Sequence, residues 1–171
     1  MFCFGYSKNC CTFASELTTE VLTFKSWIMN TKKYALTSKT IDFADDNGKK
    51  HTLHKIIALK DFGGVKVGDF GGWVESDDNL SHVGNCWVSD DAKVMDEAYV
   101  ANDALISGNC ELHDQSFLLE KSSMEGYAKV YGCVIVSGRS AITDSAQVIG
   151  CGCVCDENIG GSEVRYITSE R

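Results

Sequence analysis

An aliphatic residue occupies every sixth position from Val88 to Val154. The full set is Val88, Val94, Val100, Ile106, Leu112, Leu118, Met124, Val130, Val136, Ile142, Val148 and Val154. Two residues before each lies a small side chain, with Val134 as the exception, and two residues after each lies Gly, Asn or Asp, with Glu120 as the exception. A fixed short period of this kind is typical of a solenoid, and a period of six predicts a parallel β-helix.

Each six-residue unit predicts one short strand and one corner. Side chains alternate across a strand, so the small residue and the aliphatic residue both point inward. Gly, Asn and Asp tolerate the left-handed backbone conformation that a sharp corner needs. Three units close a triangular coil, so the units within residues 85–156 predict about four coils, stacked about 4.8 Å apart.

The segments on either side of the repeat lack this period. Residues 1–32 predict an N-terminal extension that is either helical or disordered. Residues 33–84 predict a β cap with a hairpin turn at Asp45–Gly48, because the first coil of a solenoid exposes unpaired strand edges. Residues 157–171 predict a C-terminal cap or tail, in which Tyr166 and Ile167 add a last strand.

This pattern resembles the left-handed parallel β-helix of the hexapeptide-repeat superfamily, whose best-known members are acyltransferases. The segments Ile57–Phe62, Val65–Asp69, Gly71–Val74 and Asn85–Val88 are similar to those that precede the repeat in YdcK-like proteins of bacteria and prophages. Together the resemblances cover about residues 33–156. They imply an all-β fold with a left-handed coil, and an acetyltransferase with a histidine base and an acetyl-CoA groove between subunits. The repeat specifies a fold far better than an activity.

The period also predicts which side chains point outward on each of three faces. Face B, which begins at Lys93, alternates Lys and Glu in its first column and is expected to be solvated. Face C is too apolar to remain exposed to solvent, so it predicts a dimer or trimer interface. The alternative is that the N-terminal segment covers it. The residues of face C are Tyr99, Ala101, Phe117, Leu119, Ile135, Ser137, Cys153 and Cys155.

Acidic residues gather at the corners of the early coils, and the net charge of the chain is −8. This charge disfavours direct binding to nucleic acid and suits a basic host protein or a nucleoprotein complex. The simpler interpretation is that Asp is a good corner residue. The candidate partner-binding residues are Asp90, Asp91, Asp96, Glu97, Asp103, Asp114 and Glu120.

Candidate catalytic chemistry is sparse. His113 is the one histidine on the regular coils and is a weak candidate for a general base. No loop interrupts the repeat, although such loops often carry catalytic residues in the similar enzymes.

The cysteines bear on compartment and on metal binding. Nine cysteines indicate a reducing, cytoplasmic compartment. Cys133 and Cys151 fall one coil apart, within disulfide range. A flat strand face does not provide tetrahedral ligands, so no metal site is predicted and the thiols are expected to be buried or interfacial.

Two main hypotheses follow, and neither involves a membrane, since no segment is long enough to span one. The first is a non-enzymatic protein-binding β-helix without a cofactor, plausible as a phage or mobile-element accessory protein that inhibits a host defence complex through its acidic surface. The alternative is an acetyl-CoA-dependent acetyltransferase with His113 as base. A third hypothesis is a purely structural module.

Overall fold

The computed structural model describes residues 32–168, and the predicted N-terminal extension lies almost wholly outside them. Residues Lys33–Arg171 form one compact unit. Within the described part, the secondary structure is β-strand apart from one short 3-10 helix, η1 (Asp77–Asn79). The predicted all-β class is therefore confirmed.

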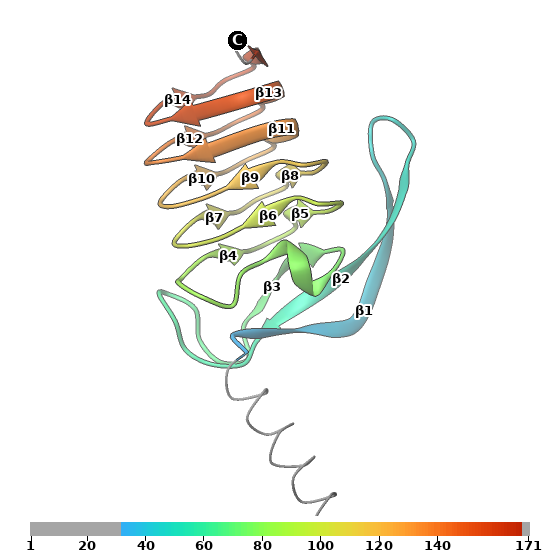
Figure 1. Ribbon diagram of the computed structural model, residues 1–171. Helices are drawn as coiled ribbons and strands as arrows, with labels where there is room; N and C mark the ends of the chain where they lie inside the picture. The colour runs from blue at the N-terminus through green and yellow to red at the C-terminus, as the bar shows by residue number, and fades with distance from the viewer. Residues whose placement is uncertain (1–31, 169–171) are drawn as a thin grey trace, which may run out of the picture. The chain divides into compact units, whose positions relative to one another are not determined.

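The strands wind into a parallel solenoid whose coils stack in Figure 1. Face A consists of β4 (Trp87–Val88), β7 (Leu105–Ile106), β10 (Ser123–Met124), β12 (Ala141–Ile142) and β14 (Asn158–Ile159). Face B consists of β3 (Phe70–Val74), β5 (Lys93–Val94), β8 (Glu111–Leu112), the first halves of β11 (Lys129–Ser137) and β13 (Gln147–Cys155), and β15 (Val164–Thr168). Face C consists of β6 (Tyr99–Val100), β9 (Phe117–Leu118) and the second halves of β11 and β13.

The inward columns pair in the register that the six-residue period predicts. Ile106 pairs with Met124, Leu112 with Val130, and so on through each face. All twelve aliphatic residues are buried, with at most 2 % of their surface exposed. Their burial supplies the hydrophobic core of the solenoid.

The solenoid has about five turns instead of the predicted four. At its start, Val74 pairs with Val94 and Leu80 bridges to Val100. At its end, Ile159 pairs with Ile142, and β15 pairs with β13. β15 includes the last strand expected at Tyr166 and Ile167. The pairings of Val74, Leu80 and Ile159 were missed because their spacings, such as Val74 to Val94, are not multiples of six. The left hand of the coil stays a prediction.

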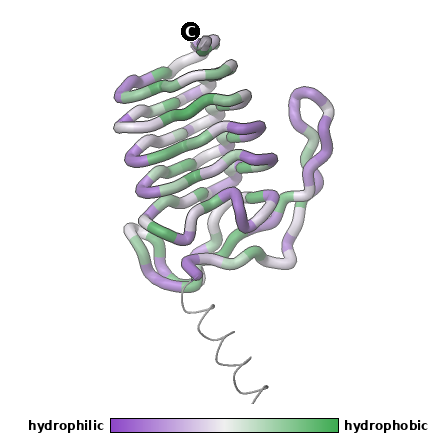
Figure 2. Tube along the Cα trace, viewed as in Figure 1, coloured by the Kyte–Doolittle hydropathy of each residue, from purple (hydrophilic) through white to green (hydrophobic). Residues whose placement is uncertain are grey.

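The corners have the predicted left-handed backbone at all twelve positions, including the exception Glu120 with φ of 61°. Acidic corner side chains also cap the next coil. For example, the Asp90 carboxylate accepts a hydrogen bond from the Gly108 amide at 3.0 Å, and the Glu120 carboxylate accepts one from the Gly138 amide at 2.8 Å. Each bond satisfies a backbone N–H that the bend leaves free. Figure 2 shows hydrophilic residues at many of these corners.

A hairpin of β1 (Tyr34–Ala44) and β2 (Lys50–Ala58) precedes the solenoid and turns at Asp45–Gly48 as predicted. β2 pairs antiparallel with β3, and β3 pairs parallel with β5, so the hairpin and face B share one sheet. Leu53 of the hairpin packs with Trp73 and Met95 in a second apolar cluster.

The hairpin lies against face B and corrects the expectation that this face is solvated. The Phe43 ring lies 4.9 Å from Lys93 Nζ, and Asp46 pairs with Lys129 Nζ at 2.7 Å. Glu111 is consequently only 9 % exposed. The predicted charge alternation is nevertheless real, since Lys129 Nζ lies 3.1 Å from the Glu111 carboxylate.

Candidate functional site

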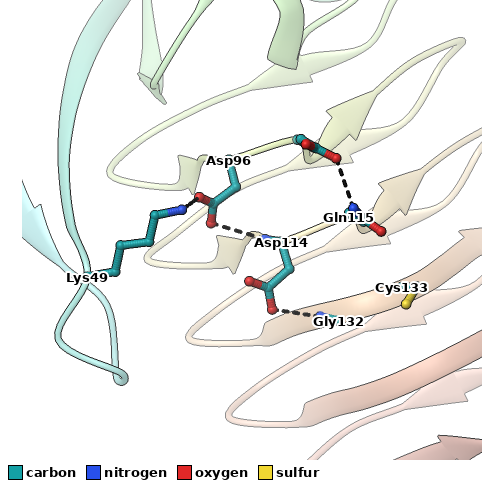
Figure 3. A pocket seen from close by; sticks show the side chains of 7 residues that line it. Lys49, Asp96, Asp114, Gln115, Gly132 and Cys133 are labelled. Carbon is teal, nitrogen blue, oxygen red and sulfur yellow. Dashed lines mark hydrogen bonds and ion pairs between the residues drawn. The ribbon is translucent and has the colours of Figure 1, made fainter.

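A cleft of about 520 Å³ opens at the corner between faces B and C, where the hairpin approaches the coils. Figure 3 shows its lining side chains. They are Lys49, Asp96, Glu97, Asp114, Gln115, Gly132 and Cys133. Three carboxylates therefore face one ammonium group, so the cleft favours a cation over an anion.

Backbone hydrogen bonds hold the two aspartates of the cleft in place. Asp96 Oδ2 accepts from the Asp114 amide at 3.3 Å, and Asp114 Oδ2 accepts from the Gly132 amide at 3.0 Å. Glu97 is fixed separately, because the Gln115 amide nitrogen donates to its carboxylate at 3.0 Å. The corner geometry thus orients the acidic groups before any ligand arrives.

Lys49, next to the hairpin turn, reaches across the cleft and pairs with Asp96 Oδ1 (Figure 3). Burial would raise the pKa of the Asp96 carboxyl, but the bonds from Lys49 and the Asp114 amide outweigh it and lower that pKa. Asp96 in turn raises the pKa of Lys49. The Lys49 side chain remains 62 % exposed, so this ion pair is easily exchanged.

His113, which precedes the lining residue Asp114, is only 2 % exposed, although its strand position predicts an outward side chain. Its ring stacks on Tyr131, with centroids 4.9 Å apart. Its Nδ1 atom lies 3.6 Å from Asp114 Oδ2 and has no hydrogen-bond partner among the described residues. A buried imidazole nitrogen beside a carboxylate is a suitable element for proton transfer.

Two groups of side chains at this corner could hold a metal ion, although the sequence predicts none. His51, Glu75 and Asp96 form one group, and Asp96, His113 and Asp114 form the other, each with ligand atoms within 4.8 Å of one another. In the first group, His51 Nδ1 already hydrogen-bonds Glu75 at 3.1 Å. Sequence reasoning missed Lys49, His51 and Glu75 because the hairpin brings them to the coil from a distance along the chain.

The seven candidate partner-binding acids separate into two sets. The cleft brings Asp96, Glu97 and Asp114 together. Asp90 and Glu120 cap corners elsewhere, Asp91 accepts from the Trp73 indole at 3.2 Å, and Asp103 accepts from Asn85 at 2.9 Å. These contacts favour the simpler, structural interpretation of the corner acids, and partner binding by the seven stays a prediction.

Face C stays partly open in the single chain. Tyr99, Phe117 and Ile135 are half-buried, and Cys153 and Cys155 are exposed. Ala101 is buried, while Leu119 and Ser137 are half-buried. The predicted interface at this face stays a prediction.

The cysteines differ between the core and the surface. Cys86 and Cys110 are buried, whereas Cys133, Cys151, Cys153 and Cys155 are exposed free thiols in the single chain. Cys133 pairs in register with Cys151, and the hydrogen bond between them raises the pKa of the Cys133 thiol.

These features define a hexapeptide-type β-solenoid with an antiparallel hairpin at its start. No protein-family model matches the chain. Over 90 residues, however, the chain is 34 % identical to the "Uncharacterized acetyltransferase YdcK" of Escherichia coli (strain K12). The match covers 51 % of this chain and 26 % of that protein, so the chain spans about a quarter of the length of the relative it matches. This distant homology confirms the resemblance to YdcK-like proteins.

Proposed function

We propose that this protein is an acetyl-CoA-dependent acetyltransferase. The observation that carries the proposal is the 34 % identity to a relative whose name describes an acetyltransferase. No similarity supports the non-enzymatic inhibitor role. Among the described residues, no helix is long and apolar enough to cross a membrane.

The acidic cleft suits the acceptor better than it suits acetyl-CoA. The diphosphate of acetyl-CoA is anionic, and three carboxylates would repel it from the cleft. The His113–Asp114 pair, by contrast, adjoins the cleft through Asp114 and is our candidate to take a proton from an acceptor bound there. Catalytic hydrogen bonds are often long before substrate binds, so the 3.6 Å separation is compatible with this role.

We place acetyl-CoA along face C, between two copies of the chain. Face C has the acidic cleft at one edge. At its other edge, exposed Lys121 and Arg139 occupy equivalent positions on neighbouring coils. A second copy packed on the apolar strip would cover it and would offer these cations to the phosphates. The donor and acceptor would then meet at the cleft.

The test measures acetyl-CoA binding by calorimetry and release of free CoA by chromatography. Chromatography is preferable to a thiol reagent, because the four exposed cysteines among residues 32–168 would react with the reagent. We expect binding by an oligomer, with about tenfold weaker affinity in the double variant Lys121→Gln/Arg139→Gln. Lys60→Gln, an exposed lysine away from face C, is the control for charge. Absence of binding at millimolar acetyl-CoA would refute the proposal.

A further inference from the structure

We infer that the cleft at the corner of faces B and C binds a primary alkylammonium group, which makes a primary amine the acceptor class of the proposed acetyltransferase. The role of the amine as acetyl acceptor rests on the proposed function, whereas the binding of the ammonium group does not. Its starting point is Lys49, whose ammonium group lies on Asp96 inside the cleft. The protein's own side chain thus occupies the place of an alkylammonium ligand.

The Lys49 ammonium group is surrounded by more carboxylates than one positive charge requires. Asp96 and Glu97 lie on one coil, and Asp114 lies on the next, about 4.8 Å away. The backbone amides that hold the aspartates engage only the Oδ2 atom of each. An ammonium group donates three hydrogen bonds, and these carboxylates can accept them. With three carboxylates against one ammonium, the cleft retains negative charge for a second cation.

A second, independent observation comes from His113. Its Nδ1 atom is buried, lacks a hydrogen-bond partner among the described residues, and lies 3.6 Å from Asp114 Oδ2. One of its ring nitrogens lies within 4.8 Å of a carboxylate oxygen of each of Asp96 and Asp114. A buried polar atom without a partner carries a free-energy cost, so its retention here needs an explanation. An ammonium bound by the two aspartates would lie near this nitrogen and could transfer a proton to it.

The chemistry of transfer needs such a proton acceptor. The ammonium first gives one proton to the His113–Asp114 pair, and the neutral nitrogen then attacks the thioester carbonyl of acetyl-CoA. The C–N bond forms as the C–S bond breaks, and the nitrogen loses its second proton. One of the two protons ends on the departing CoA thiolate and the other passes through His113 to solvent. The products are an N-acetyl amide and free CoA.

The exposed Lys49 acts as a competitor that the acceptor must displace. Its side chain is 62 % exposed, and a surface ion pair of this kind contributes only about 0–1 kcal/mol. Removing Lys49 should therefore leave the fold intact and free Asp96 for the ligand. A metal site would also gain from this change, so the experiment has to separate the two cations.

The experiment titrates the full chain with putrescine by calorimetry in 150 mM salt, with 1,4-butanediol as the neutral probe of equal length. We expect putrescine to bind and butanediol not to bind. Glu97→Gln should weaken putrescine about tenfold, and Lys49→Met should strengthen it. Asp103→Asn, which removes the same charge at a corner outside the cleft, should change the affinity less than twofold. Equal effects of Glu97→Gln and Asp103→Asn would overturn the inference, because they would indicate a general charge effect.

Zn²⁺ is titrated separately, with His113→Gln as the variant. Zn²⁺ binding that depends on His113, in a protein that does not bind putrescine, would overturn the amine inference in favour of a metal site. Acetyl-CoA binding is measured on the same samples. Acetyl-CoA binding without putrescine binding refutes the acceptor class and leaves the proposed function standing. Putrescine binding without acetyl-CoA binding supports the ammonium site and refutes the proposed function.

Discussion

In the coils between residues 85 and 156, the surroundings of each side chain recur from one coil to the next, whereas the β1–β2 hairpin has no repeat. A coil residue has its equivalents directly above and below it, as Val130 has Leu112 and Val148. The hairpin instead makes individual contacts, such as Lys49 with Asp96 and Asp46 with Lys129. The repeated region provides a rigid frame, and the hairpin brings the unrepeated side chains that turn one corner into a cleft.

The largest expected loss of stability comes from a substitution on the inward face of the coils. Leu118→Ala removes a fully buried side chain in the face C column and should lower the free energy of unfolding by about 2–5 kcal/mol. Leu105→Ala is the matched control, because Leu105 lies on the outer side of face A and is 51 % exposed. Its effect should stay within about 0.5 kcal/mol. Urea unfolding followed by circular dichroism measures both, and equal losses would contradict the assigned alternation of inward and outward positions.

A smaller effect is expected at the corners. Gly126 has φ of 81°, and a Cβ atom there would lie 2.7 Å from the Asp144 carbonyl oxygen on the next coil. Gly126→Ala should therefore cost about 1–2 kcal/mol, because an L-residue is strained in this conformation. Gly64→Ala, where a Cβ would meet nothing within 4 Å, is the control. Thermal unfolding of the two variants would contradict the corner assignment if the two midpoints moved by the same amount.

The same division explains how much of the structure could be predicted from the sequence. The periodic positions fix the register, the buried columns and all twelve corners, because each depends on neighbours at a constant separation along the chain. The turns at either end of the solenoid were missed where this separation changes, as between Ile142 and Ile159. The packing of the hairpin could not be predicted, because Lys49 and Asp96 are brought together by tertiary structure alone. Asp96, Glu97, Asp114 and His113 were all named from the sequence, whereas the burial of His113 and the approach of Lys49 to the cleft could not be predicted from it.

The smallest expected loss of stability comes from Asp96, at the contact between the hairpin and the coils. The folded protein lowers the pKa of the Asp96 carboxyl below 3.8, the ordinary value for Asp. The stability that the ionised carboxylate contributes is therefore fully present above pH 3.8 and is lost as the pH falls through the lowered pKa. Asp96→Asn should lower the free energy of unfolding by about 1 kcal/mol at pH 7, since the Lys49 pair is exposed but the Asp114 amide also loses a charged acceptor. The difference between wild type and variant should shrink toward zero once the pH is below the lowered pKa.

Urea unfolding at a series of pH values from 7 downward measures this difference, and Asp42→Asn on the outer part of the hairpin is the control. Hydrogen exchange at pH 7 locates the effect. Because Asp96 joins the hairpin to the coils, faster exchange in Asp96→Asn should be confined to β1, β2 and the corner at Asp114, while the buried strands of faces A and C keep their protection. Uniformly faster exchange would mean that the hairpin and the coils unfold as one cooperative unit, and that the frame depends on the hairpin that lies against it.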